Sequence, residues 1–404
     1  MSTYTDTLST IAWPDATPKA SYDVVIIGGG GHGLSTAYYL ATRHGITNVA
    51  VVEADYIASG NTGRNTTIIR ANYGIPEAIR FYQHSLELYQ GLEAETGADI
   101  LHQTKGIVWL AHTEMAMRTE RARCAMNQAC GAQTFMRTPE ELKALVPQLD
   151  LTGGGRYPVL GGSHHVEGAT ARHDRVAWAY ASIASQRGVD LLQHTTVTGM
   201  RLDGDRVVGV ETSRGPIAAG VVLSATGGRV TQVAAMARIR LPVRTHPLHA
   251  FVTNDHAPGF PIILASTELA CYVSQTDRGQ MLIGAEFDSQ PSYSRQSSFA
   301  ALRSYTYKIT RLLPFLGELR ILRQWAGICD ISADYSPIMG ATGVDGFLVT
   351  TGWGTWGFKA IPAGGEAMAE LIATGRPPVL IAPFGLDRFR RDHVLADQGS
   401  AGTR

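Results

Sequence analysis

The chain lacks three features that would place it in a specialised class of protein. Its 404 residues include only 4 cysteines, which form neither a CxxC pair nor a metal-ligand spacing, so a disulfide scaffold or a metal site is not expected. Neither sign of charge dominates, because Lys and Arg number 35 and so do Asp and Glu. We therefore expect no general attraction to nucleic acid or to an anionic membrane.

Long apolar runs are also missing. No segment approaches the stretch of about 20 apolar residues that crosses a bilayer. Residues 1–20, which we read as a polar N-terminal arm, lack the basic and apolar regions of a secretory signal. A cytoplasmic location is expected. The content of hydrophobic residues, 44%, is high enough for a large core divided between two or three domains.

A βαβ unit is predicted directly after the N-terminal arm. The segment YDVVIIGGGGHGLSTAYYLATRHGITNVAVVEAD contains a β-branched run, a glycine cluster, an Ala, Leu and Tyr helix and a second β-branched run, in that order. Gly28, Gly30 and Gly33 form GxGxxG between the first strand and the helix, which is where this motif binds a dinucleotide.

Each element of this motif has a physical role. Gly28 permits a tight turn, Gly30 lets the backbone approach a pyrophosphate, and Gly33 allows close packing of helix on strand. Free N–H groups and the helix dipole then hold the phosphates. Glu53 ends the second strand, where an acidic side chain accepts hydrogen bonds from the adenosine ribose. A glycine-rich turn without ligand is the alternative, and the glycines alone do not separate FAD from NAD.

Two further segments favour FAD. SGNTGRNTTIIRANYG at 59–74 is a polar loop soon after Glu53, and GWGTWGFKAIPAGG at 352–365 is a glycine loop before a helix. Both suit close approach to a flavin. The predicted cofactor-binding residues are Gly28, Gly30, Gly31, His32, Gly33, Glu53, Asn61, Thr62, Arg64, Asn65, Thr66, Thr67, Ile68, Val197, Gly227, Gly352, Gly354, Thr355, Gly357, Phe358 and Lys359.

The remaining periodicities predict a mixed α/β (α+β) chain. Helices are expected near 76–95, 114–146, 173–188 and 299–313, and strands near 106–111, 189–228, 271–275 and 280–287. The expected fold is a Rossmann-like FAD-binding domain interleaved with a substrate domain on an antiparallel or mixed sheet. The FAD-binding domain takes 21–95, 161–242 and 329–404, and the substrate domain takes 96–160 and 243–328.

Several motifs resemble the amino-acid oxidase superfamily, which includes glycine and sarcosine oxidases. More narrowly, the chain resembles the β subunits of heterotetrameric sarcosine oxidases. The resemblance rests on SYDVVIIGGGGHG, RNTTIIRANY, ARHDRVAWAYA, THPLHA, CYVSQ and GWGTWGFK. Two places depart from the family pattern: ASGNTG at 58–63, and Trp356, which stands where the family has glycine. The bulk of Trp356 is expected to narrow either the pocket or the path of the electrons.

The resemblance implies two flavins and several partners. FAD is held without a covalent bond, and FMN, shared with the α subunit, is linked to the histidine of ARHD, here His173. That attachment requires a neutral imidazole. The α, γ and δ subunits complete the heterotetramer, and the partner subunit binds tetrahydrofolate and NAD. Single-chain sarcosine oxidases tether FAD through a cysteine, but Cys329 lies about two residues from that position, so we expect it to point elsewhere as a core thiol.

The resemblance also assigns catalytic residues. Arg70 corresponds to an arginine near the substrate carboxylate, and Lys359 to a lysine beside the flavin, which suits the cationic donors that a carboxylate prefers. Tyr272 is a third candidate, on the strand CYVSQ. His246 and His249 are further candidates, with core packing as the alternative for all three of these residues.

The implied reaction is oxidative demethylation of sarcosine. Glycine and a one-carbon unit are the products, as formaldehyde or as 5,10-methylenetetrahydrofolate, and electrons pass from FAD to FMN and then to O2, which gives H2O2. One alternative is a flavin dehydrogenase subunit for another secondary amine, of the proline, opine or dimethylglycine type. The other is a non-enzymatic FAD-holding scaffold.

Overall fold

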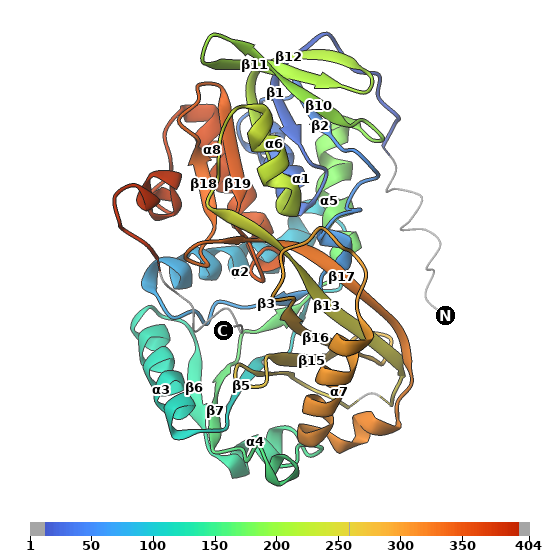
Figure 1. The fold of residues 1–404 in the computed structure, drawn as a ribbon, viewed down its shortest axis with the longest axis vertical. Coiled ribbons are helices and arrows are strands. Elements are labelled where there is room, and N and C mark those ends of the chain that lie inside the picture. Colours follow the sequence, from blue (N-terminus) through green and yellow to red (C-terminus); the bar gives the residue numbers. More distant parts are fainter. Residues whose placement is uncertain (1–12, 258, 396–404) are drawn as a thin grey trace.

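The computed structural model describes residues 13–257 and 259–395, which form two lobes around two large sheets (Figure 1). The first lobe contains the N-terminal strand β1 (Ser21–Ile27) and helix α8 (Ile361–Thr374). The second contains α3 (Glu114–Ala129), α4 (Pro139–Leu145) and α7 (Phe299–Leu312). Expectations that fall on residues 1–12 and 396–404 lie outside the described residues.

The first sheet is largely parallel and is buried beneath helices. The sequence VAVV of β2 (Val49–Val52) is buried at all four positions, as expected for a parallel strand covered on both faces. The strand order of this sheet is β10 (Val197–Asp203), β11 (Arg206–Thr212), β12 (Gly215–Ser224), β1, β2 and β9 (Asp190–Leu192). Strand β19 (Phe347–Thr351) also pairs with β12, and β18 (Ile338–Ala341) pairs with β19.

Helices α1 (Gly31–Arg43), α5 (His173–Gln186) and α8 (Ile361–Thr374) pack beside this sheet, and α6 (Val230–Met236) lies near β10 and β12. Helix α2 (Pro76–Thr96) contacts α8. Pro76 begins it and Gly97, with a φ of 70°, ends it, the usual positions for these two residues.

The second sheet is mixed but mainly antiparallel. Its order is β17 (Ile321–Ser332), β13 (Val243–Asp255), β16 (Gln280–Phe287), β15 (Cys271–Gln275), β14 (Ile263–Ser266), β5 (Ile107–Ala111), β7 (Gly161–His165) and β6 (Thr134–Arg137). Residues of α4 (Pro139–Leu145) and α7 (Phe299–Leu312) share a hydrophobic cluster with one face of this sheet, while α3 (Glu114–Ala129) contacts β5, β6 and β7.

A small sheet of β3 (Ile68–Ile69), β8 (Ala169–Thr170) and β4 (Gln103–Thr104) lies near the junction of the lobes. The mixed α/β fold class is confirmed, with a Rossmann-like first lobe and a mixed second sheet. Among the described residues, no helix combines the length and the apolar character that a bilayer crossing requires.

Two predicted domain boundaries differ from the strand pairing. We expected 161–242 to belong to the FAD-binding domain, but Gly161–His165 forms β7, which pairs with β5 and β6 in the second sheet. The sequence GGSHH has no β-branched residue to mark a strand. Strand β17 also continues to Ser332, past the expected boundary at 328.

Candidate functional site

A cavity of about 660 Å³ lies where the two sheets meet. Its walls come from the turn between β1 and α1, the end of β2, the loop at 59–66, the strands β13, β14, β15 and β17, and the loop before α8. This volume is larger than a small amino acid requires and lies within the usual range for cofactor sites.

The glycine turn leaves backbone room at the start of α1. Gly28 has a φ of +111°, and a Cβ at Gly33 would lie 2.0 Å from the Gly28 carbonyl oxygen, so both positions require glycine. No side chain caps the helix at Gly30, while the Gly31 N–H donates to Thr62 Oγ1 at 2.9 Å. The turn therefore fits a dinucleotide pyrophosphate, which accepts hydrogen bonds from such a helix start.

Glu53 lies beside this turn and lines the cavity. Its carboxylate accepts hydrogen bonds from the Gly29 N–H at 2.8 Å and from the Asp55 N–H at 2.9 Å. The side chain that we expected to bind a ribose thus also holds the glycine turn in place.

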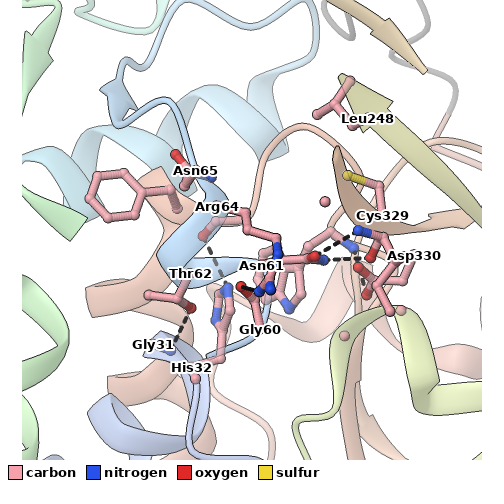
Figure 2. A pocket seen from close by; sticks show the side chains of 18 of the residues that line it. Gly31, His32, Gly60, Asn61, Thr62, Arg64, Asn65, Leu248, Cys329 and Asp330 are labelled. Atoms are coloured by element: carbon pink, nitrogen blue, oxygen red, sulfur yellow. Dashed lines mark hydrogen bonds between the residues drawn. The ribbon is translucent and has the colours of Figure 1, made fainter. Parts of the chain in front are cut away.

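The loop at 59–66 is attached to the second sheet through Asn61. Figure 2 shows this side chain reaching toward the strand that carries Cys329 and Asp330. The Asn61 amide donates to the Ile328 carbonyl at 2.5 Å and accepts from the Ile328 N–H at 2.8 Å. Arg64 donates to the carbonyls of Ser59 and Gly60. This side of the cavity is therefore tied to both lobes.

Asp330 is a cavity residue that sequence reasoning missed. Its Oδ2 accepts from the Thr351 hydroxyl at 2.8 Å, the Gly352 N–H at 2.7 Å and the Trp353 N–H at 3.3 Å. Burial raises the pKa of this carboxyl above its usual value, against those hydrogen bonds. The signal in the sequence was a lone aspartate in the otherwise uncharged strand segment GICDIS.

The expectation that Cys329 points away from the site is wrong. The thiol is 5% exposed, as expected for a core residue, yet it lies on the cavity wall, where Figure 2 shows it beside Asp330. Residues 327–330 of β17 all line the cavity, Cys329 among them. Burial raises the pKa of the Cys329 thiol well above its ordinary value.

Arg70 lies against two aromatic rings. Its guanidinium carbon is 4.3 Å from the centre of the Tyr73 ring and 5.1 Å from that of Trp109. Its Nη1 donates to the Asn72 carbonyl at 3.1 Å and to Asn72 Oδ1 at 3.0 Å. The side chain is 4% exposed and lines the cavity, so these contacts fix the direction of a buried cation.

Lys359 and Tyr272 line the same cavity. Lys359 Nζ donates to the Thr355 carbonyl at 3.0 Å, and burial, aided by the charge of Arg70, holds the pKa of this amine well below its usual value. The Tyr272 and Thr66 hydroxyls share a hydrogen bond of 2.7 Å, and burial raises the pKa of Tyr272 to about 12.

Most of the predicted cofactor-binding residues line this cavity. They are Gly28, Gly30, Gly31, His32, Glu53, Asn61, Thr62, Arg64, Asn65, Thr66, Ile68, Val197, Gly227, Gly354, Thr355, Gly357, Phe358 and Lys359, and His249 joins them. Gly33, Thr67, Gly352 and His246 are not among the lining residues. Gly352 instead donates to Asp330, behind the wall.

His173 lies outside the cavity, at the first residue of α5. Its side chain is 26% exposed, and Asp174 Oδ1 lies 3.8 Å from Nδ1. Burial and Arg172 lower the pKa of the imidazole below its usual value, although Asp174 opposes this. A neutral ring is therefore favoured at this place.

The sequence pattern of the family described as FAD dependent oxidoreductase matches residues 23–371. The chain belongs to this family. It is 43% identical to the sarcosine oxidase subunit beta of Rhodobacter capsulatus, over 97% of this chain and 94% of that relative. It is 41% identical to the protein of the same name from an Arthrobacter species, over 96% of each. Within the family, the sequence groups with sarcosine oxidase β subunits, as its motifs predicted.

Solved structures agree on the fold. The structure of L-proline dehydrogenase from P. horikoshii matches with a TM-score of 0.87 at 29% identity, over 94% of this chain and 100% of that one. Glycine oxidase from Geobacillus kaustophilus gives 0.82 at 23% identity, over 92% and 99%. Together with the family match, these findings establish a flavin-dependent oxidoreductase.

Proposed function

We propose that this chain is the FAD-binding β subunit of a multisubunit sarcosine oxidase and that it oxidises the N-methyl C–N bond of sarcosine, releasing glycine and a one-carbon unit. The observation that carries the proposal is the convergence of Arg70, Lys359 and Tyr272 on the cavity that also contains the glycine turn. Names of relatives that share over 40% of the sequence support the choice of amine.

Different residues of the cavity bind the substrate and the cofactor. The fork of Arg70 binds the substrate carboxylate, and Lys359 adds a second donor. Gly28, Gly30 and Glu53 would hold the adenosine half of FAD. The flavin ring of the bound cofactor would supply the acceptor for the hydride equivalent of the amine. Burial of the cavity excludes water and keeps the substrate amine in the uncharged form that oxidation requires. The substrate leaves this step as an imine, and its hydrolysis gives glycine and formaldehyde.

A second part of the proposal concerns His173. We propose it as the attachment point for FMN at a contact with the α subunit, with O2 as the final acceptor and with tetrahydrofolate and NAD on the partner. Its place outside the FAD cavity and its lowered pKa support this assignment, because a neutral imidazole can act as the nucleophile.

The test of the activity is anaerobic reduction of the bound flavin by a panel of amines. Sarcosine is expected to bleach the oxidised flavin absorbance faster than proline or an opine does. Faster bleaching by proline would favour the alternative of a proline dehydrogenase, which the structural match with the P. horikoshii enzyme keeps open. If no amine reduces the flavin, the chain acts as a cofactor scaffold.

The depressed pKa of Lys359 predicts a pH dependence. Acetate, a carboxylate that the enzyme does not oxidise, binds best while Nζ is protonated. Affinity is therefore expected to be highest below the folded pKa of Lys359 and to fall about ten-fold as pH rises through it, below the usual lysine value. Titration of the flavin absorbance with acetate at each pH measures this.

Lys359→Met is expected to remove the pH dependence and to leave the weaker affinity at every pH. Lys105→Met is the matched control, because burial also lowers the pKa of Lys105 but its side chain lies outside the cavity. A wild-type dissociation constant that stays constant with pH would mean that Nζ does not contact the carboxylate.

A further inference from the structure

A single row of residues crosses the second sheet beneath the cavity. Each residue is the direct cross-strand partner of the next, through five successive strand pairings. In spatial order from β5 to β17 the row is Trp109, Ala265, Tyr272, Gly284, Ala250 and Trp325. Along this face of the sheet, aromatic side chains are therefore separated by alanine and glycine.

This face is the one that meets the cavity. Trp109, Ala265, Tyr272 and Ala250 all line it. On five of these strands an adjacent residue points the other way, because side chains alternate in a strand. Those residues belong to the hydrophobic cluster beneath α7, and they are Val108, Leu264, Val273, Ile283 and Phe251.

Glycine is required at position 284 because of the Tyr272 side chain and not because of the backbone conformation. Its φ lies outside the left-handed region. A Cβ built at this position would lie 1.9 Å from Cζ, 2.0 Å from the hydroxyl oxygen and 2.2 Å from Cε2 of Tyr272. The tyrosine therefore lies flat over Gly284, which explains why Gly284 does not line the cavity whereas Ala250 and Ala265 do.

The orientation of the Tyr272 ring determines how much of the cavity surface above Ala265 is accessible to a ligand. The Thr66 hydroxyl shares a hydrogen bond with the Tyr272 hydroxyl, and the end of the ring lies over Gly284 of β16. On its other side Tyr272 packs against the apolar cluster that contains Ala265 and Trp109. The surface above Ala265 is then bounded by Tyr272 and by Trp109, whose ring also contacts the Arg70 guanidinium.

We propose that Gly284 is a positioning residue for Tyr272. The gap above Ala265, between the Tyr272 and Trp109 rings, then sets the size of the apolar group that the amine substrate carries. This inference rests on the proposed function, because a carboxylate bound to Arg70 places the rest of the substrate above the same gap. The substrate class is an amino acid whose N-substituent is small, such as a methyl group.

The first experiment is a double-mutant cycle. Gly284→Ala is expected to displace the Tyr272 ring and to raise both the dissociation constant of acetate and the KM for sarcosine at least ten-fold, with the flavin still bound. In a Tyr272→Ala background the same change is expected to have less than a two-fold effect, because the atoms that it meets are gone.

Gly199→Ala is the matched control for a glycine in a strand. It lies in β10, where an added Cβ would make ordinary contacts of 3.6 Å and 3.7 Å with Glu211, and wild-type binding is expected. Unchanged acetate binding in Gly284→Ala would overturn the inference. An equal loss with and without the Tyr272 ring would also overturn it, since the effect would then come from the sheet.

The second experiment changes Ala265, the residue below the gap. Ala265→Gly is expected to raise the ratio of kcat/KM for N-ethylglycine to that for sarcosine at least five-fold, and Ala265→Val is expected to lower it. A ratio that both variants leave unchanged would overturn the size assignment while the proposed function stands. If the wild-type protein bound no acetate and no amine reduced its flavin, both the proposed function and this inference would be overturned.

Discussion

Replacement of Arg70 by methionine is expected to lower kcat/KM for sarcosine by about a hundred-fold. Loss of a charge-assisted, two-point contact with a carboxylate costs about 3 kcal/mol when the partner is buried. Methionine has a similar length and retains packing on Tyr73 and Trp109, the rings that the guanidinium now contacts. Steady-state kinetics, together with acetate titration of the flavin absorbance, measures the loss.

Two variants separate charge from geometry. Arg70→Lys keeps the cation but loses the planar fork, so an intermediate loss is expected. Arg229→Met is the control, because Arg229 also lines the cavity but lies in an exposed position. Wild-type acetate affinity in Arg70→Met, with FAD content unchanged, would place the carboxylate elsewhere.

Substitution of His173 by alanine is expected to abolish covalent flavin completely. A methyl group cannot form the bond, and the cavity for FAD lies elsewhere, so FAD should still bind and sarcosine should still reduce it. Oxygen turnover is expected to slow in the assembled complex. Acid precipitation, followed by flavin spectroscopy of the pellet and the supernatant, measures the two flavins separately.

His44→Ala provides a matched control, since His44 also lies at a helix end, as the C-cap of α1. Its pellet is expected to retain the wild-type amount of flavin. Flavin that stays covalently bound in His173→Ala would show that another residue forms the link. Full oxidase activity without covalent flavin would show that the second flavin is not needed.

The sequence was sufficient for the elements that local pattern specifies. The βαβ unit and the helix predicted at 76–95 depend on residues close together in the chain, so periodicity and glycine position predict them. The mixed fold followed from the same patterns. The residues around the glycine turn were also predictable, because the turn and Glu53 belong to one supersecondary unit.

Features that depend on strand pairing were not predictable. The position of the Tyr272 ring over Gly284 follows from the pairing of β15 with β16. The position of Cys329 follows from the pairing of β17 with β13, which places residues 327–330 on the cavity wall. The sequence GGSHH became a strand only because β5 and β6 lie on either side of it. Local residue patterns specify the type of an element but not the register between strands far apart in the chain.

Strand β17 also has a mechanical consequence. Its middle part forms a wall of the cavity, and its far end reaches the first lobe. There Ile331 forms an isolated β-bridge with Trp353, and Asp330 accepts hydrogen bonds from the N–H groups of Gly352 and Trp353. A hinge motion that swung the lobes apart would have to break these contacts. We therefore expect ligand entry and product release to proceed by local displacement of surface segments, with the two lobes moving as one rigid frame.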